Sequence, residues 1–201
     1  MNTVSRCSVD MRVKYYKDNL NQDRMNSVEI VKLLKDDDSI LDILPKLTQN
    51  NDPKIVQEII ELFDAEKIQV RGEVFSTLFL NENDILEQLL KGLKHESKNV
   101  RSYVTLVIAN RNEKEAIQQI IELTNDSSGL VRTCAYGALG HLEVKESAKQ
   151  LHRGIFDSNL EAVKSAAYAL ARINEKITQK EIDELKKLDE SDYEKILKFF
   201  N

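Results

Sequence analysis

A valine followed by a cation recurs along this chain at an almost constant interval. The four steps are Val70-Arg71, Val100-Arg101, Val131-Arg132 and Val163-Lys164. They are separated by 30, 31 and 32 residues. A fixed period near 30 residues is typical of a repeat protein whose unit is a pair of helices. Because each unit contacts only its neighbours, such a chain builds an elongated surface and has no central pocket.

Apolar residues that precede each step form a second ladder with a similar period. Its members are Ile30, Ile59, Leu89, Ile120, Leu151 and Leu185. Within each segment, apolar side chains recur at steps of three and four residues, which predicts amphipathic helices. We therefore predict six helical hairpins, over residues 27–50, 53–81, 84–112, 115–142, 146–174 and 178–201.

Polar residues between the predicted helices indicate where helices start. Asp52 can cap a helix whose first residue is Pro53, a position that proline favours. Further caps are predicted at Ser147, Thr178 and Ser191. Pro45 falls inside the second helix of the first hairpin, where the missing N–H should bend or shorten that helix.

The second helices of hairpins four and five are rich in small residues, which predicts close contact between neighbouring helices. Residues 131–140 read Val-Arg-Thr-Cys-Ala-Tyr-Gly-Ala-Leu-Gly. This segment resembles the inner helix of HEAT repeats, specifically the short PBS-lyase HEAT-like repeats, whose pattern is roughly Val-Arg-x-Ala-Ala-x-x-Ala-Leu-Gly. Residues 162–171 match it next best. The resemblance covers most of residues 27–201 and is strongest over 98–174.

The resemblance implies an all-α fold, a right-handed α-solenoid (an α-α superhelix) of about six HEAT-like hairpins. In this family such a solenoid usually serves as a protein-binding scaffold. The cations of the ladder commonly pair in HEAT-like stacks with acids from neighbouring turns, and Asp126 and Asp157 stand at suitable positions. The alternative is an exposed cationic stripe that binds an acidic partner.

The same resemblance raises three enzymatic alternatives. Phycobilin lyases carry this repeat type, and Phe75, Tyr103, Tyr136 and Tyr168 would then form an aromatic strip for a bilin. Deoxyhypusine hydroxylase carries His-Glu pairs that bind iron, but His95-Glu96 is the one such pair in a chain with three histidines. DNA glycosylases of this repeat type need a basic face and aromatic contacts, whereas this chain is acidic and has no tryptophan.

The composition of the chain further limits its possible partners and location. The net charge is −5, and acids and bases are interspersed, so we expect no nucleic-acid partner. The sequence has no window approaching 18 apolar residues, so we predict no membrane span. The two cysteines, Cys7 and Cys134, do not form a disulfide framework, which favours a reducing, cytoplasmic location. We interpret Cys134 as a buried, unreactive thiol.

Residues 1–26 are polar and predict an N-terminal arm before a repeat domain over 27–201.

These observations favour a non-catalytic scaffold that binds a protein or peptide on its concave inner-helix face. We expect no cofactor and no metal, and a monomer or weak homo-oligomer. Tyrosine and arginine are the residue types that most often dominate binding at interfaces. The predicted contact residues are Arg101, Tyr103, Arg132, Tyr136, Lys164 and Tyr168.

Overall fold

The structure is a computed structural model and describes residues 25–200. The predicted N-terminal arm, residues 1–26, lies outside the described residues apart from its last two positions. Over residues 25–200 the secondary structure is helical, without strands, which confirms the predicted all-α class.

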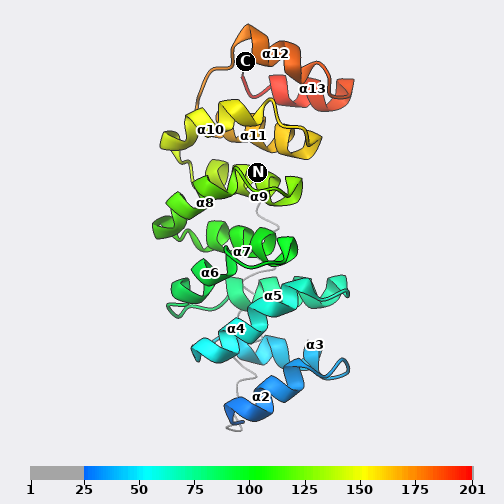
Figure 1. The fold of residues 1–201 in the computed structure, drawn as a ribbon, viewed down its shortest axis with the longest axis vertical. Helices are drawn as coiled ribbons and strands as arrows, with labels where there is room; N and C mark the ends of the chain where they lie inside the picture. Colours follow the sequence, from blue (N-terminus) through cyan, green and yellow to red (C-terminus); the bar gives the residue numbers. More distant parts are fainter. Residues whose placement is uncertain (1–24, 201) are drawn as a thin grey trace. The chain divides into compact units, whose positions relative to one another are not determined.

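Each predicted hairpin is present as a pair of helices (Figure 1). The first helices of the pairs are α2 (Ser27–Leu34), α4 (Pro53–Glu61), α6 (Leu86–Gly92), α8 (Ile117–Leu123), α10 (Ala148–Gly154) and α12 (Gln179–Leu185). The second helices, called inner helices below, are α3 (Ile40–Ile43), α5 (Ile68–Phe79), α7 (Lys98–Arg111), α9 (Gly129–His141), α11 (Leu160–Arg172) and α13 (Glu190–Leu197). The chain divides into two compact units between Gln88 and Leu89, within α6.

In unit 1, Pro45 has the predicted effect on the first inner helix. The α-helix α3 ends at Ile43, and the chain continues as a 3₁₀ helix, Leu44–Leu47, that contains the proline. A hydrogen bond then joins the two hairpins of this unit, because Thr77 Oγ1 of α5 donates to the Leu44 carbonyl oxygen at 3.1 Å. The Asn81 side-chain amide likewise donates to the Asn50 carbonyl oxygen at 2.7 Å.

Two of the four helix caps predicted from the sequence form as expected. Asp52 caps α4 as predicted and accepts a hydrogen bond from the Lys54 N–H, and Thr178 forms a capping box with Glu181. One predicted cap is wrong, and another has the predicted position without the side-chain hydrogen bond. Ser191 lies inside α13, which Asp189 caps instead. Ser147 is the N-cap residue of α10 as predicted, but its hydroxyl donates to the Val144 carbonyl oxygen and does not cap the helix.

In unit 2 the inner helices α7, α9, α11 and α13 contact one another in that order. Small residues allow this packing, as the sequence predicted. A methyl group added to Gly140 of α9 would lie 2.7 Å from the Cα and Cβ atoms of Ala169 in α11. Glycine is therefore required at position 140, because the backbones of α9 and α11 approach each other there.

Three inner helices of unit 2 end in the same way. Asn112, Glu143 and Asn174 follow α7, α9 and α11 and adopt φ values of 58°, 54° and 60°. The next residue in each case donates its N–H to a carbonyl oxygen five residues back, for example Val144 to Leu139 at 3.0 Å. This left-handed termination satisfies carbonyl groups that would otherwise have no partner at the helix end.

The first helices of the hairpins carry a polar ladder that the sequence analysis missed. Its members are Gln57, Gln88, Gln119, Gln150 and Glu181, each 31 residues after the last. All five side chains are buried or half-buried. Glu181, the last member, accepts hydrogen bonds from Thr178 and lies 2.6 Å from His152 Nδ1 of the preceding hairpin.

Candidate functional site

Two cations of the sequence ladder, Arg101 and Arg132, lie between consecutive turns of unit 2. Arg101 Nε and Nη2 donate to the two carboxylate oxygens of Asp126 at 2.8 and 2.9 Å. Its Nη1 donates to the carbonyl oxygens of His95 and Glu96, both at 2.7 Å. One guanidinium therefore fixes the turn of its own hairpin and the turn of the next one. Bidentate pairs of this kind are both directional and strong.

Arg132 repeats this arrangement one hairpin further along. Its Nε and Nη2 donate to Asp157 at 2.7 and 2.6 Å, and its Nη1 donates to the carbonyl oxygens of Asp126 and Ser127 at 2.8 and 3.2 Å. Arg132 and Asp157 side chains are 16% and 6% exposed. The predicted pairing of Arg101 and Arg132 with acids of neighbouring turns is confirmed.

The two aspartates have perturbed pKa values. Burial alone would raise the pKa of Asp126, but hydrogen bonds from Arg101 and from the Ser128 N–H hold that pKa below its ordinary value. The pKa of Asp157 is lowered in the same way, against the effect of burial, by Arg132 and the Asn159 N–H. Both carboxylates are therefore ionised partners in the fold.

The ladder changes at both ends. In unit 1, Arg71 Nη1 donates to the carbonyl oxygens of Ala65 and Glu66, which is half of the Arg101 arrangement. In unit 2, Lys164 replaces arginine and lies 2.5 Å from Asp192 of α13 and 2.8 Å from Glu161. The hydrogen bonds to Asp192 and Glu161 raise the pKa of Lys164.

Tyr136 is a core residue. Its side chain is 2% exposed, and its hydroxyl lies 3.4 Å from the Thr124 carbonyl oxygen. A methyl group added to Gly154 of α10 would lie 2.8 Å from Cζ of this ring, so the glycine makes room for it. Burial raises the pKa of the phenol. Tyr136 therefore offers no accessible surface to a partner in this structure.

The other two tyrosines among the predicted contact residues are half-buried on inner helices. Tyr103 lies on α7. Tyr168 lies on α11, and its ring packs edge-to-face on Phe199, with centroids 5.4 Å apart and an interplanar angle of 87°. Phe199 is 63% exposed. Phe75, the fourth aromatic considered above, stacks on Phe79 in unit 1.

The middle of the α9 surface has little side-chain cover. Gly137 is exposed, and a methyl group added there would have one neighbour within 4 Å, Ser165 Oγ of α11 at 3.8 Å. Cys134, one turn earlier, is buried, and burial raises the pKa of its thiol to about 11. This thiol is protonated at neutral pH, as expected for an unreactive cysteine.

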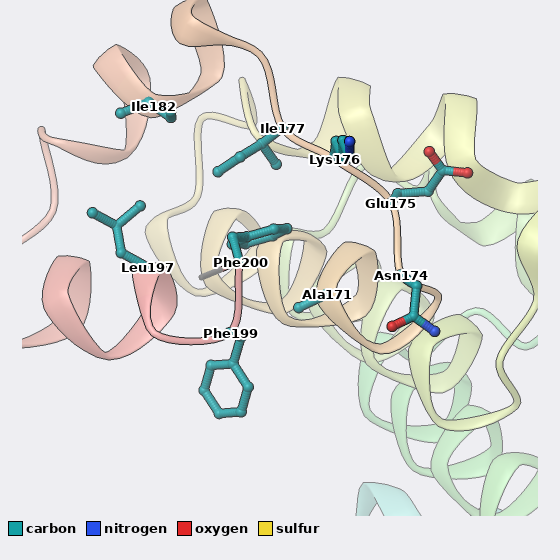
Figure 2. Close-up of a pocket in the computed structure, with 9 residues that line it drawn as sticks. All are labelled: Ala171, Asn174, Glu175, Lys176, Ile177, Ile182, Leu197, Phe199 and Phe200. Atoms are coloured by element: carbon teal, nitrogen blue, oxygen red, sulfur yellow. The ribbon is translucent and has the colours of Figure 1, made fainter.

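A groove opens where α11, the α11–α12 connection and the residues after α13 meet (Figure 2). Its volume is about 380 Å³. The apolar lining residues are Ala171, Ile177, Ile182, Leu197, Phe199 and Phe200. Asn174, Glu175 and Lys176 supply the polar part of the lining. Phe199 belongs both to this groove and to the aromatic pair with Tyr168.

The three histidines do not form a cluster. His95 Nδ1 accepts a hydrogen bond from the Ser97 N–H, His141 is exposed at the end of α9, and His152 pairs with Glu181. Within residues 25–200 no group of three or more histidine, cysteine or acidic side chains is arranged to hold a metal ion. None of the helices in that range is long and apolar enough to cross a membrane.

The comparison with known families agrees with this architecture. Residues 86–171 match the family model for HEAT repeats. The matched region begins with α6 and ends in α11, so it contains both complete Arg–Asp pairs. No curated protein matches the chain.

Solved structures share the fold at low sequence identity. One engineered protein is 20% identical, with a TM-score of 0.54 over 87% of this chain and 97% of that chain. A second is 19% identical, with a TM-score of 0.50 over 87% and 95%. A computationally designed armadillo repeat protein for modular peptide recognition is 17% identical, with a TM-score of 0.51 over 86% and 99%. These likenesses establish a helical repeat fold and nothing about activity.

Proposed function

We propose that the chain is a non-catalytic scaffold that binds a protein or peptide on the inner-helix face of unit 2. The observation that carries this proposal is the Tyr168–Phe199 pair, an edge-to-face aromatic contact with Phe199 largely exposed. Exposed aromatic side chains on a rigid support are frequent anchors of protein interfaces. The fold of a designed armadillo protein for modular peptide recognition also supports this proposal.

The predicted contact residues divide into two groups on this proposal. Arg101 and Arg132 use their guanidinium donors on turns of the protein itself, so they position the helices that carry the face. Tyr103, Lys164 and Tyr168 are half-buried on the inner helices and retain accessible surface for a partner. We leave Tyr136 out of the proposed face because it is buried.

Affinity capture from the native cell extract tests this proposal. The double variant Tyr168→Ser/Phe199→Ser removes the aromatic pair. We expect it to remain folded by circular dichroism and to lose a stoichiometric protein partner that the unchanged chain retains.

Phe156→Ser is the matched control, because Phe156 is also an exposed aromatic residue, 43% exposed, and its ring contacts Lys180. This variant should keep the partner. Equal capture by the unchanged protein and a folded double variant would reject the proposed face.

We also keep the remaining predictions from the sequence as part of this proposal. We propose the short PBS-lyase HEAT-like type for the repeats, on the basis of residues 131–140, without a bilin-related activity. We also propose a cytoplasmic location, a monomer or weak homo-oligomer, and a repeat domain over residues 27–201 preceded by a polar arm.

A further inference from the structure

We propose that the sixth hairpin, α12 and α13, opens away from α10 and α11 as one piece, and that Lys164 is a weakened latch that permits this opening. Phe199 follows α13 and Tyr168 belongs to α11, so opening separates the two rings of the aromatic pair. The hairpin thereby makes or removes this surface feature of unit 2. Its movement does not depend on the proposed function.

The cation ladder and its acids keep one spacing up to this hairpin. In each of the two Arg–Asp pairs the residues are 25 positions apart. The same step from Lys164 leads to Asp189. Like the two paired aspartates, Asp189 accepts a backbone N–H at the start of the next inner helix, in this case that of Asp192 at 3.0 Å. The chain therefore keeps the acid of a third pair but has lysine in place of its arginine.

Lysine does not reproduce the double contact of the arginines. A guanidinium has donors on two sides, so Arg132 binds a turn of its own hairpin and Asp157 of the next hairpin at once. Lys164 has a single ammonium, which lies 2.8 Å from Glu161 of the same helix and 2.5 Å from Asp192 inside α13. Within the described structure this side chain holds α13 by one carboxylate and leaves the turn before α11 untied.

Two further contacts across this junction also involve charged side chains. His152 Nδ1 lies 2.6 Å from Glu181 Oε1, and Lys180 Nζ lies 5.2 Å from the centroid of the Phe156 ring. The second contact is exposed on both sides, and such contacts contribute little to stability. The first is more buried, so we expect it to hold the hairpin closed for most of the time.

Packing at this junction differs from packing at the preceding one. Between α9 and α11 the backbones touch at Gly140. Between α11 and the sixth hairpin lies the groove of about 380 Å³, seen in Figure 2 between Ala171 and Ile182. Side chains that line such a space lose contacts on one side. Leu185 and Ile196 are nevertheless fully buried, so the hairpin is packed in the closed arrangement.

The remaining requirement for opening is a hinge. Residues 173–178 connect α11 to α12 without a helix and line part of the groove. Such connections absorb the backbone rotations of a moving element. Within residues 25–200, moreover, the sixth hairpin has a neighbouring hairpin on one side only. Elements with few tertiary contacts open at a lower free energy than the rest of a protein.

Hydrogen exchange measured by mass spectrometry tests the inference on the full chain. We compare peptides from α12 and α13 with peptides from α9, after correction for the intrinsic exchange rates. We expect the amides of α12 and α13 to exchange at one common rate, at least about tenfold faster than those of α9.

The variant Lys164→Arg identifies the latch, because it restores the ladder residue opposite Asp189. We expect it to slow exchange in both α12 and α13 by about tenfold and to leave α9 unchanged. The matched control is Lys187→Arg, the same substitution at an exposed lysine that pairs within its own helix with Glu184. This control should exchange like the unchanged protein.

Three results would overturn the inference. One is equal protection of α9, α12 and α13, which would mean that the sixth hairpin opens only when unit 2 unfolds. Another is fast exchange in α13 alone, which would indicate fraying of one helix. The last is an equal effect of Lys164→Arg and Lys187→Arg. No partner is present in this measurement, so its failure leaves the proposed function standing.

Discussion

Arg132 contacts two consecutive turns at once, and this double contact explains why a cation recurs with the period of the repeat. Its Nη1 holds carbonyl oxygens of the turn before α9, while Nε and Nη2 hold Asp157 in the turn before α11. Asp157 in turn accepts the Asn159 N–H at 2.8 Å. Loss of either partner therefore disturbs two hairpins.

Replacement of Asp157 tests the strength of this contact. Asp157→Ala leaves the Arg132 guanidinium without its carboxylate and removes an acceptor in the turn, so we expect a loss of about 2–4 kcal/mol of unfolding free energy. Urea denaturation measures it. The matched control is Glu184→Ala, which breaks the exposed contact with Lys187 and should cost less than about 1 kcal/mol. Similar losses in both variants would contradict the account.

The same carboxylates give stability a pH dependence. Despite burial, the folded protein lowers the pKa of Asp126 and Asp157. Their contribution is therefore complete above the unfolded pKa, about 3.9, and is lost as the pH falls through the folded values. We expect the free energy of unfolding to fall below about pH 4. In Asp126→Asn/Asp157→Asn this slope should be shallower. An unchanged slope would show that other groups control acid unfolding.

Glu143 is a second residue with a predictable effect. It follows α9 and has a φ of 54°, a conformation that is disfavoured by roughly 1 kcal/mol for most residues other than glycine and asparagine. Asn112 and Asn174 occupy the equivalent positions, so Glu143→Asn should raise the melting temperature. The control Asn174→Glu should lower it. Opposite shifts would contradict the interpretation of these helix ends.

Residue-scale prediction from the sequence succeeded for the cations and missed Tyr136. The Arg–Asp pairs were predictable because each acid falls in a polar turn at a fixed distance from its arginine. The burial of Tyr136 depends on Gly154, 18 residues later, whose missing side chain makes room for the ring. A pattern within one helix does not reveal such a contact.

At the scale of elements, α9 carries two glycines with different roles three residues apart. Gly140 faces the backbone of α11, whereas a methyl group at Gly137 would meet only Ser165 Oγ, at an ordinary contact distance of 3.8 Å. A glycine inside a helix costs about 0.5–1 kcal/mol relative to alanine, so position 137 bears a cost that packing within the protein does not require.

Alanine substitution separates these roles. Gly137→Ala should increase the free energy of unfolding by up to about 1 kcal/mol, since no backbone lies near the new methyl group. Gly140→Ala should decrease it by about 1–3 kcal/mol, because the methyl group would overlap Ala169 and force α9 and α11 apart. Chemical denaturation of both variants makes the comparison. Equal effects would contradict the helix packing described here.

The helices themselves were predictable, but two further periodic features were not recognised. The glutamines at positions 57, 88, 119 and 150 have a strict period of 31 residues, as do the left-handed residues 112, 143 and 174. Polar residues on a helix are usually assigned to its solvent-exposed side. The burial of a polar side chain such as Gln88 depends on packing that a single helix does not specify.

At the scale of the whole molecule, the period establishes the fold class, and the surface determines the function. A ladder near 31 residues predicts stacked hairpins whatever they bind, because each hairpin needs its neighbours to bury its apolar side. The groove was not predictable, since its lining comes from α11, the connection after it and the C-terminal residues. Function follows from sites on a fold and is not fixed by the fold itself.

The central claim is that a partner protein contacts the inner-helix face at Tyr168. Site-specific photocrosslinking in cells tests it most directly, with a photoreactive phenylalanine at position 168 and, as the control, at position 156. Our account predicts a discrete adduct with one protein from position 168 and none of that adduct from position 156. An adduct with a partner from position 156, and none from position 168, would place the interface elsewhere and contradict the account.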